Sequence, residues 1–474
     1  MNLLNHTRSY YMCKPYLYFP GSTADFQESW LETLPFVPVG KFNPYHTQQW
    51  MELAKECKTS FFFICLNPTL PEIGLHALER MIRVAEDSGA GMVYSNHWEI
   101  KNKIRSNHPV NDYQTGSIRD DFDFGPLMLI RTEAVKNYFS QTPTNYSHAG
   151  WYQIRLAISR SYPLIHLEEY LYTVEDFDLR NSDEKMFAYV DPKNRSVQLE
   201  MEASCTEHLK EIGAWLPPVF ESVELSEDSF PVEASVIIPV RNRVKTIADA
   251  IRSATSQMAD FSFNILIVDN HSTDGTTELI AKLASKDKRI IHIKPERQDL
   301  GIGGCWNLAV QDEACGRFSI QLDSDDVYSG PDTLQKIVQT FYQEKCAMLV
   351  GSYRMCDFNL NTIPPGIIDH KEWTLENGRN NALRINGLGA PRAFYTKALR
   401  TIKLPNTSYG EDYAVGLQFS RRWKIGRIYD ILYLCRRWED NSDASIDLVR
   451  LNANNAYKDK LRSLEITARQ LWNK

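Results

Sequence analysis

The sequence predicts an α/β protein in which one fold occurs twice in tandem. From residue 235 onward, short apolar runs alternate with segments of helical spacing, the pattern of a parallel sheet with helices on both faces. Segments of the first half of the chain can also be laid over segments of the second half in the same order. In the second half, acidic residues follow the predicted strands, at the edge where open α/β sheets bind ligands.

The elements of the second half are the easier to place. Ser235–Pro239 is a buried strand that ends at a proline, and Asn264–Asp269 is a second apolar strand followed by a turn-rich stretch. Further strands are predicted at 290–293 and 318–322, and helices at 247–259, 276–284, 306–314 and from 332 onward. The glycines of residues 301–304 predict a flexible loop.

The first half repeats this pattern. Its apolar run Phe61–Leu66, which precedes a helical segment, lies on the run that ends at Leu322, and Trp50 then falls on Trp306. Further on, residues 125–132 lie on 389–396, residues 152–160 on 413–421, and residues 171–172 on 432–433. We interpret this as a divergent internal duplication; the alternative is that two α/β domains resemble each other by patterning alone.

The two copies differ where chemistry is expected. Asp323 and Asp325 of the second copy correspond to Asn67 and Thr69, and the pair Glu411-Asp412 corresponds to Gly150-Trp151. No counterpart of residues 264–289 is evident in the first half, so we expect it to lack the strand that ends at Asp269. The first copy is therefore predicted to be catalytically silent.

These patterns give a domain organisation. We expect a degenerate first domain at 1–185, a helix and acidic linker at 186–232, a catalytic domain at 233–445 and a C-terminal helix at 446–474. The linker helix is predicted at 196–212 and the C-terminal helix at 448–472.

Composition excludes several classes of protein. The net charge of −7 argues against a nucleic-acid-binding protein, which needs a basic surface. The nine cysteines are scattered and show no C-x-x-C spacing, so neither a zinc site nor a disulfide framework is indicated, and they fit a reducing compartment. No apolar run approaches the ~20 residues of a membrane span, and the first residues lack the apolar core of a signal peptide. We expect a cytoplasmic protein, and peripheral contact with the inner face of a membrane stays open, as does the oligomeric state.

The acidic stretch around Asp323 is the centre of the predicted site. Asp323, Asp325 and Asp326 follow an apolar strand directly. Carboxylates this close repel one another, and a divalent cation removes the conflict. Oxygen ligands suit Mg²⁺ or Mn²⁺. A lone D-x-D is more often a solvated turn, but its position after a buried strand and its partners elsewhere favour a metal site.

Three further segments belong with it: Pro239-Val-Arg-Asn-Arg243, Val268-Asp-Asn-His-Ser-Thr-Asp-Gly275 and Tyr409-Gly-Glu-Asp412. Together with the D-x-D, this order and spacing resembles the inverting family-2 glycosyltransferases of GT-A fold, over about residues 235–445. The resemblance implies a nucleotide-diphospho-sugar transferase (GT-A, Rossmann-like) fold, and the duplication implies two tandem copies of it. It also implies transfer of a sugar from a nucleoside-diphosphate donor to a hydroxyl of a glycan or lipid-linked acceptor.

The resemblance assigns roles to individual residues. Asp412 would be the general base, and Glu411 its neighbour and an acceptor ligand. A divalent cation, Mn²⁺ or Mg²⁺, would be held by Asp325 with help from Asp323. The remaining donor-binding residues would be Asp269 and Asn270 beside the nucleoside, Pro239 and Arg241 at the base or phosphate side, and Asp323.

The chain departs from the family's pattern at three points. Asn270 stands where many relatives have a second Asp, which leaves the nucleotide open. Trp306-Asn307 replaces an Arg-Asn pair, so Arg241 or Arg243 could replace a missing phosphate contact. Trp438 stands where a His is usual, so no histidine ligand to the metal is expected there. Arg436 or Arg437, beside it, could contact the donor phosphates.

The sequence favours three other functions less. A non-catalytic glycan- or nucleotide-sugar-binding module is the main alternative, and the presence of Asp323, Asp325 and Asp412 argues against it. A nucleotidyltransferase would show a glycine-rich phosphate loop after the first strand, which Pro239-Val-Arg-Asn242 is not. A dinucleotide oxidoreductase is disfavoured because no G-x-G-x-x-G follows a strand.

Overall fold

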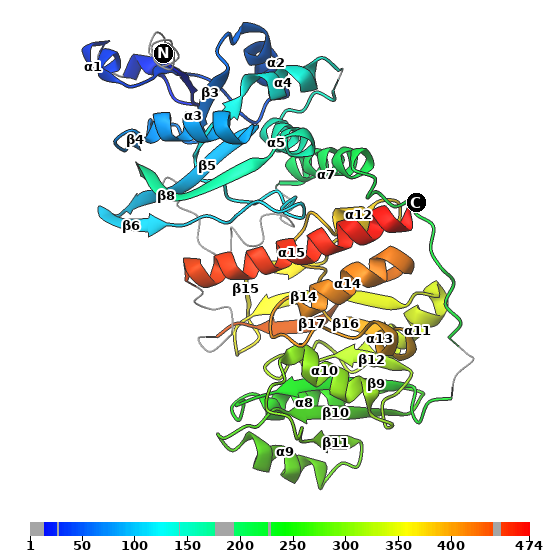
Figure 1. Ribbon diagram of the computed structural model, residues 1–474. Coiled ribbons are helices and arrows are strands. Elements are labelled where there is room, and N and C mark those ends of the chain that lie inside the picture. Colours follow the sequence, from blue (N-terminus) through cyan, green and yellow to red (C-terminus); the bar gives the residue numbers. More distant parts are fainter. Residues whose placement is uncertain (1–13, 26–27, 142, 176–193, 226–228, 439–446) are drawn as a thin grey trace, which may run out of the picture. The chain divides into compact units, whose positions relative to one another are not determined.

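The computed structural model describes residues 14–25, 28–141, 143–175, 194–225, 229–438 and 447–474. The chain divides into two compact units. The first comprises Met1–Arg180, Asn194–Ala214 and Asp447–Ser463, and the second comprises Asn181–Lys193, Trp215–Ile446 and Leu464–Lys474. Each unit is built on its own sheet, which can be followed in Figure 1.

The first unit contains an eight-stranded sheet in the order β2-β1-β3-β7-β5-β8-β4, with β6 paired to β5. Its strands are β1 (Tyr16–Tyr18), β2 (Val37–Val39), β3 (Phe61–Cys65), β4 (Glu72–Ile73), β5 (Met92–Lys101), β6 (Ile104–His108), β7 (Leu127–Arg131) and β8 (Leu164–Glu175). Its helices are α1 (Glu28–Thr33), α2 (Thr47–Glu56), α3 (Ala77–Ser88), α4 (Thr132–Phe139), α5 (Gly150–Ser161) and α7 (Arg195–Glu211), with a 3₁₀ turn at Thr23–Asp25.

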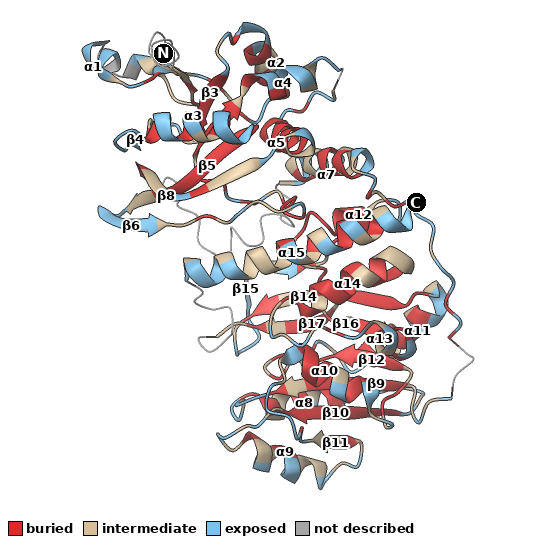
Figure 2. Cartoon of the chain, viewed as in Figure 1, coloured by how far each residue is buried: buried red, intermediate tan, exposed pale blue. Residues whose placement is uncertain are grey.

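Apolar side chains on both faces of this sheet produce two cores. Successive side chains of a strand point to opposite faces, so Phe62 and Ile64 of β3 pack with α2, α4 and α5, while Phe61 and Phe63 pack with α3. All five residues of β3 are buried, as expected for a strand covered on both sides. Figure 2 shows the same layering, with buried strands between helices whose outer faces are exposed.

The second unit contains a nine-stranded sheet in the order β11-β10-β9-β12-β16-β14-β17-β13, with β15 paired to β14. Its strands are β9 (Ala234–Val240), β10 (Phe263–Asp269), β11 (Ile290–Ile293), β12 (Phe318–Gln321), β13 (Val327–Tyr328), β14 (Met348–Cys356), β15 (Thr362–Ile368), β16 (Arg392–Tyr395) and β17 (Ile425–Arg436). Its helices are α8 (Ile247–Thr255), α9 (Thr276–Ala284), α10 (Ile302–Gln311), α11 (Thr333–Glu344), α12 (Gly378–Asn381), α13 (Thr396–Ile402) and α14 (Glu411–Arg422); α15 (Leu448–Trp472) ends the chain.

The sheet of the second unit is mixed, whereas the alternation of strands and helices predicted a parallel one. Strands β11, β10, β9 and β12 are parallel, but β16 runs antiparallel to both β12 and β14. Apolar patterning identifies a strand but not its direction, and the long connection between β14 and β16 brings the chain back along the opposite course.

The two units have corresponding topologies and registers, which confirms the tandem duplication. In each, a central strand is paired antiparallel to one neighbour and parallel to the next: β5 with β7 and β8, β14 with β16 and β17. Met92 pairs with Ile130 and Leu164, as Met348 pairs with Phe394 and Ile425. The helices correspond as well, because α5 and α14 both span twelve residues and precede β8 and β17 directly.

One expected difference between the copies was wrong. The first unit does have a counterpart of the strand that ends at Asp269, because β2 pairs parallel to β1 as β10 pairs parallel to β9. This counterpart is only three residues long, contains Pro38 and lies at the edge of its sheet. Proline is tolerated at such an edge, and so short a run gives no usable pattern in the sequence.

The expected loop at residues 301–304 was also wrong, because α10 already begins at Ile302. Its glycines are required by packing rather than by flexibility. A Cβ atom at Gly303 would lie well inside van der Waals contact with the backbone oxygen of Pro405, and one at Gly304 would clash with Asn406. The glycines therefore let α10 approach the 405–407 segment closely. The eight cysteines within the described residues are free.

Candidate active site

The predicted site residues of the first three segments lie at one edge of the second sheet. Strands β9, β10 and β12 are parallel, and Pro239 pairs with Val268 while Gln321 pairs with Ile237. The loops that carry Arg241, Asn270 and Asp323 therefore leave the sheet at the same level. This is the carboxyl edge, where ligands bind in open α/β sheets.

The loop after β9 is fixed by the loop after β10. The backbone N–H of Val244 donates to the Asp274 carboxylate (3.0 Å), and that of Arg243 donates to the Thr276 hydroxyl (2.8 Å). Asn242, with φ +52°, accepts from the N–H of Thr273 (2.8 Å). The Ser-Thr-Asp-Gly-Thr run, which sequence reasoning treated as turn chemistry, therefore holds the backbone that presents Arg241 and Arg243.

Asp269 is buried, and its carboxylate is already engaged. One oxygen accepts from the N–H of Ser272 (3.2 Å), and the other accepts from the hydroxyl of Thr277 (2.5 Å) and lies 3.2 Å from His292 Nε2. Burial raises its pKa, but these hydrogen bonds outweigh burial and lower it overall. Asn270, half-buried, donates its amide N–H to the carbonyl of Leu300 (2.8 Å). Both predicted nucleoside residues are thus held in fixed positions.

The three acids after β12 have different environments. Asp323 is half-buried, and its carboxylate accepts from Gln321 Nε2 (2.9 Å). Asp326 is buried, and its carboxylate accepts the backbone N–H of Arg436 (2.7 Å), so it anchors the end of β17. Burial raises the pKa of both groups. Asp325 keeps 15% of its side chain exposed, and its Oδ2 lies 3.7 Å from Arg243 Nε.

Trp438 contacts this acid cluster. Its indole N–H donates to Asp325 Oδ2 (3.3 Å), and the cationic groups of Arg243 and Lys245 lie 5.8 and 5.9 Å from its ring centre. Indole has no acceptor nitrogen and cannot coordinate a metal. Trp438 therefore orients Asp325 and does not act as a ligand.

The second acid pair meets an arginine that the sequence analysis did not single out. Asp412, in the first turn of α14, has one carboxylate oxygen 2.7 Å from Arg392 Nη1. The backbone N–H of Arg392 donates to Gln321 Oε1 (3.0 Å), while Gln321 Nε2 binds Asp323. Gln321 and Arg392 thus link the D-x-D to the Glu411-Asp412 pair. Only the spatial neighbourhood of β12 and β16 reveals this, because no local motif contains Arg392.

Glu411 differs sharply from its neighbour. It is 9% exposed, and its Oε2 has no hydrogen-bond partner among the described residues. Burial, together with the charge of Asp412, raises the pKa of Glu411 to about 8, so this carboxyl is neutral at pH 7. The α14 N-terminus thus places a neutral carboxyl beside Asp412, which is paired with Arg392.

The predicted metal ligands fit a hard divalent cation by their chemistry. Asp323 and Asp325 supply carboxylate oxygens, the donors that Mg²⁺ and Mn²⁺ prefer. Burial and the mutual repulsion of the acids raise the pKa of Asp323, and a bound cation would relieve that repulsion.

The first unit lacks this chemistry at every corresponding position. Asn67 and Thr69 replace the two acids, Met128 corresponds to Arg392, and Gly150-Trp151 corresponds to the Glu411-Asp412 pair. Trp151 is buried in the core and stacks on Trp50 with ring centres 5.9 Å apart. The polar edge of one copy is therefore an aromatic core in the other.

Comparison with known proteins identifies the family that the central part of the second unit matches. Residues 235–402 match the model of glycosyl transferase family 2. The chain is 28% identical over 196 residues to an uncharacterized glycosyltransferase of Haemophilus influenzae, covering 41% of this chain and 74% of that protein. It is 40% identical over 94 residues to one of Rickettsia conorii, covering 20% of this chain and 15% of that protein. It is 26% identical over 228 residues to the chondroitin synthase of Pasteurella multocida, covering 42% of this chain and 23% of that protein.

The second unit is therefore a glycosyltransferase domain. Its residues 235–402 match glycosyl transferase family 2, it has the GT-A fold, and it follows a degenerate copy of the same fold. Two of the relatives are named for glycan synthesis: the chondroitin synthase and a putative teichuronic acid biosynthesis glycosyltransferase of Bacillus subtilis. In the part of the chain that the structure describes, no helix combines the length and the apolar character needed to cross a bilayer.

Proposed function

We propose that this protein transfers a sugar from a nucleoside diphosphate to an acceptor hydroxyl with inversion at the anomeric carbon. The observation that carries the proposal is the Asp412–Arg392 ion pair (2.7 Å), linked through Gln321 to Asp323. An ionised carboxylate is a competent general base. The acceptor that we propose is a hydroxyl of a glycan, either free or lipid-linked, in polysaccharide synthesis.

In the proposed step, Asp412 takes the proton of the acceptor hydroxyl. The acceptor oxygen forms a bond to the anomeric carbon from the face opposite the diphosphate. The bond from that carbon to the diphosphate oxygen breaks, and its electron pair leaves with the diphosphate. Glu411, neutral at pH 7, can donate a hydrogen bond to a substrate oxygen. The two neighbouring carboxyls would then have different roles, Asp412 as the general base and Glu411 as a hydrogen-bond donor.

We propose that Asp323 and Asp325 hold a divalent cation, Mg²⁺ or Mn²⁺. A cation bound there would supply positive charge to offset the charge that develops on the leaving diphosphate. Arg241 and Arg243, on a loop held by Asp274 and Thr276, would contact phosphate oxygens at the same edge. Pro239 and the fixed pair Asp269-Asn270 would form the wall against the nucleoside.

We further propose that residues 233–445 form the catalytic domain and that the first domain, residues 1–185, does not catalyse transfer. The replacement of its acids by Asn67, Thr69 and Trp151 supports this. Thr69→Ala is the matched test, because Thr69 occupies the position that corresponds to Asp325 and its side chain is exposed. We expect this variant to keep wild-type activity.

The experiment is calorimetric titration of UDP, GDP, dTDP and CDP into the full chain, with and without Mn²⁺, for wild type and Asp325→Ala. We expect one nucleotide to bind in a metal-dependent manner and Asp325→Ala to lose that dependence. If no nucleotide binds with metal, the non-catalytic glycan-binding alternative replaces the transferase. Hydrolysis or transfer of the matching nucleotide sugar then tests the reaction itself.

A further inference from the structure

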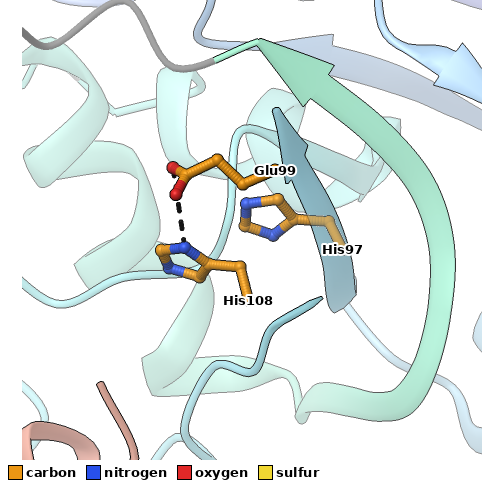
Figure 3. A group of neighbouring side chains, drawn as sticks. All are labelled: His97, Glu99 and His108. Atoms are coloured by element: carbon orange, nitrogen blue, oxygen red, sulfur yellow. Dashed lines mark ion pairs between the residues drawn. The ribbon is translucent and has the colours of Figure 1, made fainter. Parts of the chain in front are cut away.

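Two histidines and a glutamate, none of them part of the candidate active site, converge on the β5–β6 hairpin of the first unit (Figure 3). His97 of β5 lies directly opposite His108 of β6 in the antiparallel register. Glu99 is two residues beyond His97 and therefore projects from the same face of β5. The ligand atoms of the three side chains all lie within 4.8 Å of one another.

A fourth residue orients one of the imidazoles. His108 Nε2 lies 2.9 Å from Asp123 Oδ2, and the other oxygen of Asp123 accepts from the N–H of Gly125 (2.7 Å). His108 therefore turns its second nitrogen, Nδ1, toward Glu99 Oε1, 3.7 Å away. A carboxylate behind a histidine is the usual support of a metal-binding imidazole.

The distance between His108 Nδ1 and Glu99 Oε1 is that of a loose ion pair, which a shared cation would replace. At 3.7 Å it exceeds hydrogen-bonding range. Two ligands on one tetrahedral zinc, with bonds of ~2.0–2.1 Å, lie about 3.3 Å apart. A small side-chain rotation would close the remaining difference.

His97 has a buried ring nitrogen that the described part of the chain leaves without a partner. It is 3% exposed, and its Nδ1 is buried without a hydrogen-bond partner among the described residues. Its ring is stacked between those of His108 and Tyr172, with centres 4.4 and 5.2 Å away. A buried, unpartnered imidazole nitrogen is costly unless a ligand meets it.

The duplication shows that the shared fold does not account for this cluster. In the second unit, the register places Tyr353 and Met355 at the positions of His97 and Glu99, and Ile368 opposite Tyr353. None of these three residues is among the usual ligands of Zn²⁺, which are Cys, His, Asp and Glu. The metal-binding residue types are thus specific to the copy that lacks the catalytic acids.

We propose that His97, Glu99 and His108 bind a divalent transition metal in the first unit, with Asp123 orienting His108. Two imidazoles and one carboxylate suit Zn²⁺, with a fourth position for water. The all-oxygen pair Asp323 and Asp325 of the second unit has the opposite preference, so the two sites are distinguishable by metal. A bound Zn²⁺ would join both strands of the hairpin.

The test is titration of Zn²⁺ into the chelator-treated full chain against a chromogenic indicator, followed by Co²⁺ as a spectroscopic probe. We expect one tight equivalent of Zn²⁺ in wild type, with affinity reduced at least about tenfold in His97→Ala and in Glu99→Gln. His46→Ala, which removes an exposed histidine, and Asp325→Ala should bind Zn²⁺ as wild type does. Bound Co²⁺ should give visible absorption typical of nitrogen and oxygen ligands, and Glu99→Gln should lose it.

Glu99→Gln guards against a folding artefact, because this side chain is one-quarter exposed and the substitution keeps its shape. Zn²⁺ should raise the Tm of wild type but not that of Glu99→Gln, since a ligand stabilises only the state that binds it. Equal Zn²⁺ affinity in wild type, His97→Ala and Glu99→Gln, or the absence of tight binding in wild type, would overturn the proposal.

Discussion

The two units of this chain share the same arrangement of strands and helices but differ in the side chains at one edge of the sheet, which carry charge in the second unit and not in the first. In the second unit, the loop after β12, the start of β16 and the start of α14 bring together four acids and an arginine: Asp323, Asp325, Glu411, Asp412 and Arg392. In the first unit the corresponding positions hold Asn67, Thr69, Met128 and a buried tryptophan. Register and helix packing were kept while the chemistry was not, so the fold alone does not report function.

The most severe test of the comparison is Asp412→Asn. Removing the proposed base should lower kcat about 10²–10⁴-fold, the usual contribution of a general base. Metal-dependent nucleotide binding, measured by calorimetry, should stay within about twofold of wild type. Residual transfer near the wild-type rate would show that the base lies elsewhere, and would remove the main chemical difference between the units.

Asp325→Ala and Thr69→Ala form a matched pair at corresponding positions. Asp325→Ala should weaken binding of the donor nucleotide in Mn²⁺ about tenfold or more, because one of two proposed cation ligands is lost. Thr69→Ala should change neither binding nor turnover, because its side chain is exposed in a unit without the partner acids. A loss of activity in Thr69→Ala would mean that the first unit takes part in transfer.

Arg392→Met gives the second unit the residue that the first has at Met128. Without the guanidinium 2.7 Å away, the carboxylate of Asp412 is harder to ionise, so its pKa rises. The acid limb of the pH–kcat profile should then move upward by about one unit, and Arg392→Lys should restore most of the shift. An unchanged acid limb would indicate that Arg392 has only a structural role.

Glu411→Gln should have the smallest effect and acts on stability. The folded carboxyl has a pKa of about 8 against an ordinary value of 4.5, so folding takes up a proton between these values. The free energy of unfolding of wild type therefore falls as pH rises from about 4.5 to 8. Glu411→Gln should flatten the Tm–pH curve over this window and have the higher Tm at pH 8. Parallel Tm–pH curves for wild type and Glu411→Gln would show that Glu411 is not the group whose pKa is raised.

Much of the fold was predictable from the sequence because its patterns are local. The bounds of α9 and β11 were predicted to the residue, and those of β9 and β10 within one. The duplication was also predicted, and the register of β7 with β5 and of β16 with β14 agrees with it. Strand direction, the helical glycines of α10 and the short strand β2 depend on contacts between distant segments, which apolar patterning does not encode.

The candidate site divides in the same way. Acids that follow a strand, such as Asp323, or open a helix, such as Asp412, can be recognised from order and spacing. Arg392 cannot, because it enters the site through the pairing of β16 with β12. The same holds for His97 and His108, which meet only because β5 and β6 fold into a hairpin. The sequence shows two histidines in strand-like segments, but their spacing matches no known metal-binding motif.

The tie between the loops after β9 and β10 has a consequence for anyone reading natural or selected variants of this protein. Asp274 and Thr276 accept hydrogen bonds from the backbone N–H groups of Val244 and Arg243. A change at either position would displace Arg241 and Arg243 and so resemble a direct loss of substrate contact. A binding surface inferred from inactive variants would then wrongly include Asp274 and Thr276. Pairing each such variant with its arginine neighbour in a double-mutant cycle separates scaffold from contact, because a scaffold residue and the arginine it supports are strongly non-additive.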